Sequence, residues 1–392
     1  MKIAIINTLY APYQVGGAER SVEVLASGLT AAGVRVSILT LHEGQSVERE
    51  QRDGVDIWRL PLRNRYWPFD LIKRSALERL GWHLRDVYNF SARRDLRHAL
   101  EVISPDLVHT NNLAGFSVSA WDAAAELDLP IVHTARDYYL LHPNSTLFSN
   151  GVTQNEAALV PRLWSVVKRT AGRKVADFVS ISAYVRDIHR RNGHFPASRT
   201  HVVHNSVMLP EKGIARVGRP RGKRVFGFIG RLDASKGVEC LLEAARRSPA
   251  SQWLIAGNGS PQYVTSLKEA ASVNVTFLGY QDPADFFSMV DVLVVPSLWA
   301  EPLGRVVLEA YAYGVPVLSS GLGGLAGIVE EDRTGWYFNA NDIESLLIGM
   351  GKAQACDIDR ISVTCLGRAS DFSSESIAAR YVSVYEGVLS NV

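Results

Sequence analysis

Apolar and polar residues alternate along the chain in two patterns. Short apolar runs such as "KIAIIN" near the start are typical of buried β-strands. Longer stretches separate them, in which apolar residues recur every three or four positions. After the first run, Val22, Leu25, Ala26 and Leu29 share one face of a predicted helix, and "VRVSILT" then resumes the strand pattern. This alternation predicts βαβ units, which build α/β domains with parallel sheets.

The strand runs fall into two series. A segment rich in proline, glycine and charge, "SVMLPEKGIARVGRPRGK", separates them and is typical of a linker. We therefore expect two doubly wound, Rossmann-like domains whose sheets face each other across a cleft. The sequence does not indicate which domain the C-terminal helix packs on, and one option is that it returns to the N-terminal domain. The expected ranges are an N-terminal domain at 1–208, a linker at 209–222, a C-terminal domain at 223–372 and the helix at 373–392.

Composition narrows the class of protein. The 392 residues, 47% of them hydrophobic, are enough for two cores, and a net charge of +2 gives no reason to expect a nucleic-acid partner. No run approaches the roughly 18 apolar residues of a membrane span, and the N-terminus resembles a strand more than a signal peptide. Cys240, Cys356 and Cys365 have no metal-binding or disulfide spacing. We expect a cytoplasmic protein without a metal site.

One candidate site follows the strand that ends in "FIG". The loop "RLDASKG" places Arg231 and Lys236 between that strand and a helix pattern. An arginine binds phosphate oxygens in pairs and a lysine adds a compact charge, so the loop suits a diphosphate. The alternative is a turn whose two cations face water.

A second candidate site is "WAEPLGRVVLEAYAYGVPVLSS", after the strand "VLVVPS". The free amides of a helix that starts near Gly304 would favour an anion. Glu301 precedes this helix and Glu309 lies within it, so each carboxylate could accept hydrogen bonds from hydroxyls on one side of that anion. A nucleotide sugar has this layout. The alternatives are a helix-start acid for Glu301 and a solvated helix residue for Glu309.

These motifs together resemble a known family. "GRLDASKG" followed by "AEPLGRVVLEAYAYGVPVLSS", "GGLAGIVE" and "TGWYF" is similar to the family 4 retaining glycosyltransferases, group 1, of the GT-B fold. The resemblance also covers "GGAER" and "VVHNSV", and so most of the chain. It implies transfer of a sugar, with retention, from a UDP- or GDP-sugar to a glycan, a lipid-linked sugar or a small molecule. It implies no cofactor and no metal.

The resemblance also assigns residues. It implies that Arg231 and Lys236 bind the donor diphosphate, that Glu301 contacts the transferred sugar and that Glu309 contacts the ribose. It also implies that the backbone amides of Leu303, Gly304, Arg305 and Val306 hold the phosphates, and that Gly16 and Gly17 line the cleft from the N-terminal domain, close to donor and acceptor.

The chain departs from the family at Arg136, where many members have a histidine. We expect Arg136 to end its strand in the cleft, facing the donor sugar or phosphates, with Asp137 beside it. Both join Glu301 as catalytic candidates. Alternatively, Arg136 pairs with a carboxylate and only holds the loop "RDYYLLHP". His133 and His109 are further possible site residues, although His109 is equally consistent with a core histidine.

Other signals weigh less. "GLGGLA" at 321–326 matches a dinucleotide-binding pattern without the required βαβ context, and Gly327 stands where many relatives have a glutamate. The "DID" of 357–359 is more consistent with solvated helix acids than with a metal motif. Residues 63–97 are rich in basic and aromatic side chains, which suits peripheral contact with an anionic membrane or a solvated cover of the sheet.

Two functional alternatives remain open. One is another enzyme of the same fold, a phosphorylase or an epimerase. The other is a catalytically silent module that binds sugar nucleotides, which the presence of Arg231, Lys236, Glu301 and Glu309 disfavours.

Overall fold

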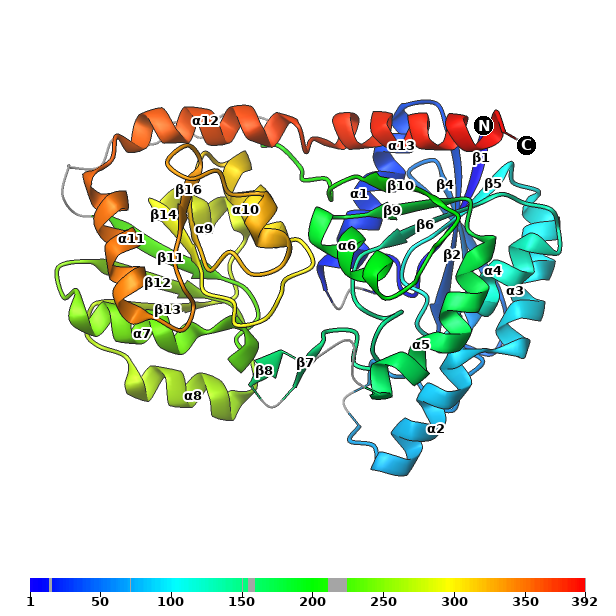
Figure 1. Cartoon of the computed structure of the whole chain (residues 1–392), viewed down its shortest axis with the longest axis horizontal. Helices are drawn as coiled ribbons and strands as arrows, with labels where there is room; N and C mark the ends of the chain where they lie inside the picture. Colours follow the sequence, from blue (N-terminus) through cyan, green and yellow to red (C-terminus); the bar gives the residue numbers. More distant parts are fainter. Residues whose placement is uncertain (14–15, 71, 150, 154–158, 211–223, 392) are drawn as a thin grey trace. The chain divides into compact units, whose positions relative to one another are not determined.

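The computed structural model describes residues 1–13, 16–70, 72–149, 151–153, 159–210 and 224–391. The chain forms two compact units. Unit 1 comprises 1–147, 155–206 and 374–392, and unit 2 comprises 148–154 and 207–373. Each unit contains its own largely parallel sheet with helices (Figure 1), so the predicted fold class of two parallel α/β domains is confirmed. Most of the expected linker at 209–222 lies outside the described residues.

The sheet of unit 1 has the strand order β10-β9-β6-β5-β1-β2-β4-β3. All neighbouring strands are parallel except β3, a charged edge strand that pairs antiparallel with β4. The strand order reverses between β1 and β5, which is where ligands bind in doubly wound sheets. The strands are β1 (Lys2–Ile6), β2 (Arg35–His42), β3 (Glu48–Arg52), β4 (Val55–Pro61), β5 (Leu107–Thr110), β6 (Ile131–Ala135), β9 (Asp177–Ser180) and β10 (Arg199–Val202).

Among the described residues, seven α-helices belong to unit 1. Side chains of Ser75, Asn89 and Ser182 cap three of them by accepting a backbone N–H of the first turn. They are α1 (Gly17–Ala31), α2 (Ala76–Val87), α3 (Phe90–Ile103), α4 (Ser119–Ala125), α5 (Leu159–Ala171), α6 (Ala183–Arg191) and α13 (Ser374–Leu389).

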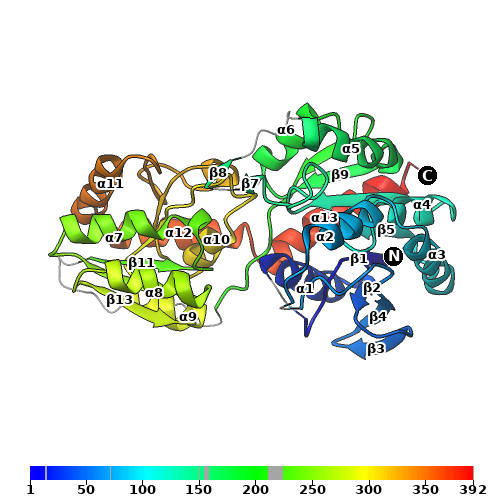
Figure 2. The ribbon, with the colours of Figure 1, turned by 90° about the horizontal axis from the view of Figure 1, so that it is seen from below.

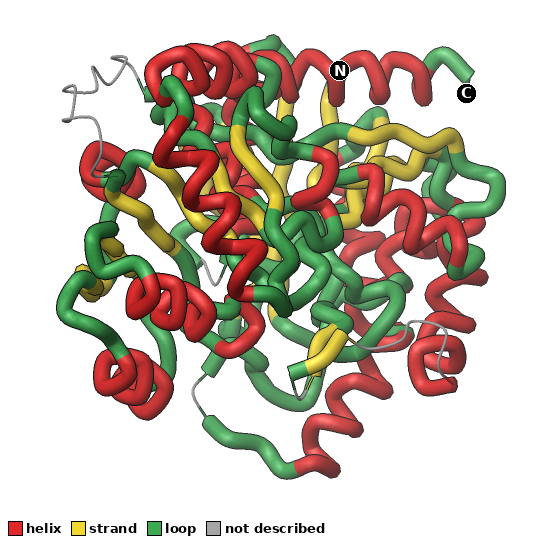
Figure 3. Tube along the Cα trace, turned by 60° about the vertical axis from the view of Figure 1, so that its left-hand side comes forward, coloured by secondary structure: helices red, strands yellow, loops and turns green. Residues whose placement is uncertain are grey.

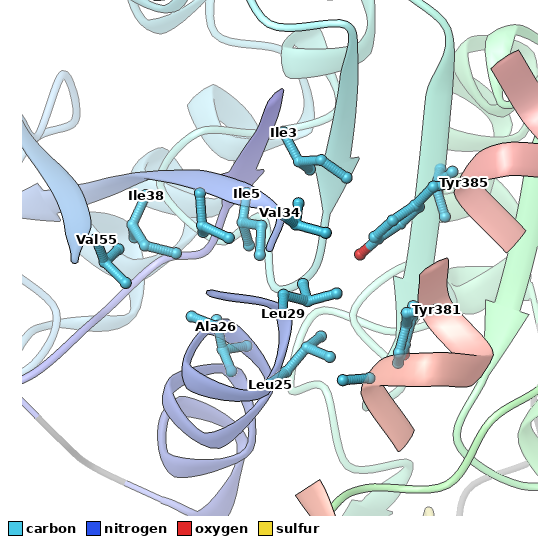
Figure 4. Close-up of a cluster of buried hydrophobic side chains, with 14 of the residues drawn as sticks. Ile3, Ile5, Leu25, Ala26, Leu29, Val34, Ile38, Val55, Tyr381 and Tyr385 are labelled. Atoms are coloured by element: carbon cyan, nitrogen blue, oxygen red, sulfur yellow. The ribbon is translucent and has the colours of Figure 1, made fainter. Parts of the chain in front are cut away.

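The last helix, α13, is part of the core of unit 1. Its apolar face packs against α1 and joins the cluster that contains Ile3, Ile5 and Leu25. Figure 4 shows Tyr381 and Tyr385 pointing from this helix toward α1 and the strands. Their hydroxyls bond to Thr134 and His109 of the sheet. The sequence left the position of this helix open, and its tyrosines attach it to unit 1.

The sheet of unit 2 has the order β13-β12-β11-β14-β15-β16, all parallel, and it reverses between β11 and β14. The strands are β11 (Val225–Ile229), β12 (Gln252–Ala256), β13 (Val275–Gly279), β14 (Val292–Val295), β15 (Val317–Ser319) and β16 (Gly335–Tyr337). A separate short hairpin pairs β7 (Phe148–Ser149) with β8 (Val152–Thr153). The switch point of this sheet therefore lies between the two loops that carry the sequence motifs.

Helices cover both sheets, and the strands, yellow in Figure 3, lie among red helices. In unit 2, α7 contacts α8 and α11 (Figure 2), and α10 contacts α12. The helices of this unit are α7 (Val238–Arg247), α8 (Pro261–Ala270), α9 (Pro283–Met289), α10 (Arg305–Ala312), α11 (Ile343–Ala355) and α12 (Ile358–Ser370).

Candidate functional site

The two motif loops of unit 2 meet at the switch point. The N–H of Leu298, after β14, donates to the carbonyl of Ser235, after β11, at 2.8 Å. Gly237 has a φ of +68°, and a Cβ there would lie 2.2 Å from the carbonyl oxygen of Pro296. Only glycine fits this close approach. Lys236 and Glu301 are 65 positions apart in the sequence, and this contact joins their loops.

Lys236 and Glu301 form the centre of this site. The ammonium of Lys236 donates to Glu301 Oε1 at 2.5 Å, and the same oxygen accepts from Ser297 Oγ at 2.7 Å and from Trp299 Nε1 at 3.0 Å. Glu301 is only 7% exposed. A half-buried cation thus pairs with a buried carboxylate whose position is fixed by three donors.

The other predicted cations of unit 2 are also paired. Arg231 is exposed and donates to Asp233, two residues away. Arg305 pairs with Glu309 one turn further along α10, with 2.9 Å between Nε and Oε1. Glu309 is half-buried, so it does not fully match the alternative of a solvated helix residue.

The start of α10 is the other part of the site. Gly304 precedes the helix with a φ of +84°. Gly304 is the N-cap, Arg305 and Val306 are the first helical positions, and Leu303 directly precedes them. An anion is favoured at such a terminus.

The glycine-rich stretch 321–326 supports the loop of Glu301. Gly323 pairs with Glu301 as an isolated β-bridge, and the N–H of Gly324 donates to the Glu301 carbonyl at 2.6 Å. With a φ of +67°, Gly323 would place a Cβ 2.4 Å from that carbonyl oxygen. These glycines allow close backbone packing, which accounts for them without a dinucleotide.

In unit 1, Gly16 and Gly17 begin α1 after β1. Both are exposed, and the N–H of Gly16 donates to the carboxylate of Glu19 at 2.9 Å. Glu19 is buried and closes the first turn of the helix. The pair therefore places an exposed helix N-terminus at the carboxyl edge of this sheet.

Arg136 ends β6 in a buried polar cluster of unit 1. Its guanidinium donates from Nε to Asn111 Oδ1 at 2.8 Å and from Nη1 to Asn205 Oδ1. Asn111 follows β5 and Asn205 follows β10, so three strand ends contribute. Burial lowers the pKa of the guanidinium, and the Tyr381 hydroxyl opposes that shift.

Asp137 points to a different set of partners. Its Oδ1 accepts the N–H of Tyr139 at 2.8 Å, and burial raises its pKa. Lys168 on α5 donates to the Tyr139 carbonyl at 2.7 Å, and its field opposes the raised pKa of both Asp137 and Asp86. Asp137, Asp86 and Lys168 form an electrostatic group beneath the loop that follows β6.

Both candidate histidines lie in the core of unit 1. His109 Nε2 contacts Thr134 Oγ1 at 2.7 Å, and its Nδ1 shares a hydrogen bond with the Tyr385 hydroxyl at 2.7 Å. His133 Nδ1 contacts Thr110 Oγ1 at 2.9 Å on the opposite face. Burial lowers the pKa of His109 strongly and that of His133 to about 3. Both are therefore neutral and hydrogen-bonded, as expected of core histidines.

The basic segment 63–97 carries fewer free charges than its sequence suggests. Arg63 pairs with Asp95, Arg74 with Asp70, and Arg93 with Glu126. Arg97 pairs with Glu101 and Glu126. Exposed leucines accompany the cations on α2: Leu77, Leu80 and Leu84 are 79%, 54% and 61% exposed.

The described residues contain no group of three or more histidine, cysteine, aspartate or glutamate side chains placed to hold a metal ion. No helix in the described ranges is long and apolar enough to cross a bilayer.

Three side chains of these clusters were not singled out from the sequence: Ser297, Trp299 and Asn205. Each follows a predicted strand, and that position was the available signal. Their contacts depend on partners up to 69 positions away, as for Arg136 and Asn205.

Comparison with known proteins defines the class. Over the whole chain, the fold matches sucrose-phosphate synthase from Thermosynechococcus elongatus with a TM-score of 0.76, 22% identity and 100% of both chains covered. Anabaena HepE in complex with UDP and glucose matches with a TM-score of 0.70 and 19% identity, over 99% of this chain and 100% of that one. The fold is therefore GT-B.

Sequence comparison gives the family. Residues 16–206 match the glycosyl transferase 4-like domain, and residues 211–357 match glycosyl transferases group 1. An uncharacterized 42.6 kDa protein of the cps region of Klebsiella pneumoniae is 38% identical over 325 residues, which are 83% of this chain and 86% of that protein. The chain belongs to the group 1 glycosyltransferases, and the family resemblance of its motifs is confirmed.

A more distant relative has a named activity. The D-inositol 3-phosphate glycosyltransferase of Mycobacterium bovis is 28% identical over 305 residues, which are 71% of this chain but 58% of that protein.

Proposed function

We propose that the protein transfers a sugar, with retention of configuration, from a UDP- or GDP-sugar to a hydroxyl of an acceptor. The observation that carries this proposal is the Lys236–Glu301 pair at the switch point of unit 2, next to the N-terminus of α10. A cation and the amides of a helix N-terminus suit a diphosphate, and a carboxylate fixed beside them suits sugar hydroxyls. The complex of HepE with UDP and glucose is consistent with such a donor.

The residues take the following roles. Lys236 and Arg231 bind the diphosphate, together with the amides of Leu303, Gly304, Arg305 and Val306. Glu301 orients the transferred sugar, and Glu309 accepts hydrogen bonds from the ribose. Gly16 and Gly17, exposed at the start of α1, are the donor-side positions of unit 1.

The reaction needs a good leaving group more than a protein nucleophile. The acceptor oxygen bonds to the anomeric carbon on the face from which the diphosphate leaves, and the bond from that carbon to the phosphate oxygen breaks. A phosphate oxygen takes the acceptor proton. The charge that develops on the diphosphate is stabilised by the cations and helix amides, which act as preorganised electrostatic groups. This assignment requires neither a metal nor a cofactor.

A panel of nucleotides and nucleotide sugars tests the donor class. A ligand that binds only the folded state increases the free energy of unfolding by mass action, and so raises the unfolding temperature. At a ligand concentration 100 times the Kd, the increase in free energy is about 2.7 kcal/mol. We expect UDP, GDP or their sugars to stabilise the wild type and the control Lys268→Met, whose lysine is exposed on α8. No stabilisation by any member would contradict the proposal.

Turnover distinguishes the enzyme from its rivals. Release of nucleotide diphosphate should require an acceptor hydroxyl. Turnover without an acceptor would indicate an epimerase, and a strict phosphate requirement would indicate a phosphorylase. Stabilisation by nucleotide sugars with no turnover would favour the silent binding module.

We also propose that the protein works in the cytoplasm and contacts an anionic membrane surface through residues 63–97. The support is α2, where Leu77, Leu80 and Leu84 are exposed beside Arg79 and Arg85. Neither arginine has an ion pair among the described residues. Apolar side chains flanked by unpaired cations suit a membrane surface, where the side chains contact the apolar acyl region and the cations contact anionic headgroups.

A further inference from the structure

Arg136 is a buried cation with neutral partners. The residue is 7% exposed, and its hydrogen bonds go to the amide oxygens of Asn111 and Asn205. An arginine stays protonated at any ordinary pH, so this site carries a full positive charge. Removing such a charge from water is costly unless an anion compensates it.

Within the part of the chain that the structure describes, no carboxylate compensates Arg136. No ion pair joins it to an aspartate or a glutamate there, and Asp137 points to the N–H of Tyr139 instead. Arg59 is the contrasting case in the same unit. It is equally buried, at 5% exposed, and it pairs with Glu50. The missing anion is thus a property of the Arg136 site.

A second, independent observation lies beside the guanidinium. Asn111 is 2% exposed, and its Nδ2 has no hydrogen-bond partner among the described residues. The amide cannot be turned to remedy this, because its oxygen must face the N–H of Arg136. The hydroxyl of Ser206, next to Asn205, is also buried without a described partner. Unsatisfied buried donors in a native structure require an explanation, and a ligand is one.

The location fits a ligand. Asn111, Arg136 and Asn205 follow β5, β6 and β10, at the carboxyl edge of the sheet in unit 1. Ligands of doubly wound sheets bind beyond this edge. A guanidinium with neighbouring amide N–H groups and no carboxylate selects an anion of phosphate or carboxylate geometry.

We propose that Arg136, Asn111 and Asn205 bind an anionic group, a phosphate or a carboxylate, carried by the acceptor. This proposal rests on the proposed function, in which the cations of unit 2 already bind the donor diphosphate. The enzyme would therefore prefer an acceptor with a negative charge near the reacting hydroxyl over its neutral counterpart.

Inorganic phosphate, in the absence of nucleotide, is the first probe. Thermal unfolding is measured with phosphate and with chloride at equal ionic strength. Hydrogen exchange then locates the protection in unit 1 or unit 2. We expect phosphate to raise the unfolding temperature and to protect unit 1 in the wild type, in the control Arg59→Met and in Lys236→Met. Arg136→Met should lose this response.

Asn111→Asp keeps the test decisive if Arg136→Met fails to fold. This variant supplies a carboxylate next to the guanidinium. We expect a higher unfolding temperature than the wild type without phosphate, and little further rise when phosphate is added. A full phosphate response in Asn111→Asp or Arg136→Met, or no protection of unit 1 in the wild type, would overturn the proposal.

Turnover measurements then show whether the anion that Arg136 binds belongs to the acceptor or to the donor. Acceptor pairs that differ by one phosphate or carboxylate are compared. Arg136→Lys should reduce kcat/KM for the charged member about tenfold or more relative to the neutral member, the size of a lost charge-assisted contact. Equal losses for both members would assign Arg136 to the donor instead. Nucleotide binding is measured separately. Failure of the proposed function would show as no stabilisation by any nucleotide, whereas failure of this inference would show as no phosphate protection of unit 1.

Discussion

Lys236 of unit 2 and Arg136 of unit 1 are both cations at the carboxyl edges of parallel sheets, but they differ in their partners. Lys236 is partly exposed and already paired with Glu301, whereas Arg136 is buried among neutral oxygens. A cation that has a carboxylate partner can exist without a ligand at little cost. A buried cation without one is stabilised by an incoming anion.

The difference suggests a division of labour between the two units. Under the proposed function, an incoming diphosphate would compete with Glu301 for Lys236 in unit 2, and Glu301 would then be available for sugar hydroxyls. In unit 1 the proposed anion would meet a guanidinium already held by two asparagines. Exchange of partners suits a donor that must bind, react and leave, and a preformed charge suits discrimination between acceptors.

Glu301→Gln should produce the largest effect. We expect turnover to fall about 100-fold, comparable to the loss of one preorganised electrostatic contact in other enzymes. Free nucleotide diphosphate should bind unchanged or more tightly, because Lys236 loses its carboxylate partner. Calorimetry and initial rates measure both quantities.

Glu309→Gln is the matched comparison, since it should weaken free nucleotide binding as well. Identical losses of nucleotide affinity in both glutamine variants would contradict the separate roles of the two carboxylates.

Lys236→Met should weaken nucleotide diphosphate binding tenfold or more, because a charge-assisted hydrogen bond contributes about 1.5–3 kcal/mol. Arg231→Met should have a smaller effect in the same direction, since Arg231 is exposed and pairs with Asp233. Calorimetry with the diphosphate measures the loss, and Lys268→Met is the control. Unchanged affinity in both variants would remove these residues from the donor site.

Acid should destabilise unit 1 before unit 2. All ten histidines of the chain lie in 1–206. Burial lowers the pKa of His133 to about 3 and of His189 to about 4, so below pH ~6.5 the unfolded chain binds protons that the folded unit does not. Stability should fall from there toward pH 4 by up to about 1.4 kcal/mol per pH unit for each such histidine. Hydrogen exchange against pH reads the two units separately.

His194→Phe sharpens this measurement. Both ring nitrogens of His194 are buried without a partner in the described ranges, and its ring lies near that of Phe195. The variant should stabilise unit 1 at neutral pH. It should also reduce the slope of stability against pH by about the contribution of one histidine. A steeper slope, or earlier unfolding of unit 2, would refute the assignment.

Membrane contact should show the smallest effect. Leu80→Ser should reduce binding to anionic vesicles about fivefold, because partial burial of one leucine contributes about 1 kcal/mol. Vesicle flotation measures this, and binding should fall as salt rises. Ile348→Ser, at an exposed apolar position of unit 2, is the control. Equal binding to neutral vesicles, or no binding, would favour the solvated cover.

The sheets could be predicted because their strands are buried runs with a regular period. The loops of unit 2 could be predicted because Arg231, Lys236, Glu301 and Glu309 stand beside strand ends and a helix start. The partners of these side chains could not, because a contact such as Ser297 with Glu301 depends on how a loop folds back.

Counting charges along the sequence was less informative in the segment 63–97. Its arginines looked uncompensated because several of their partners come from elsewhere, such as Glu126 for Arg93. Arg136 presented the opposite case. A carboxylate partner was a reasonable alternative from the sequence, and only the folded arrangement shows two asparagines in that position.

The place of α13 in unit 1 has a consequence for synthesis. Ser374–Leu389 emerges from the ribosome after all of unit 2, yet it supplies Tyr381 and Tyr385 to the core that contains Ile3 and Ile5. The N-terminal part of the nascent chain therefore waits with an open apolar surface while the intervening 207–373 unit is made and folds. The unit that begins first is completed last, and early termination of translation within α13 would leave unit 2 intact and unit 1 dependent on chaperones.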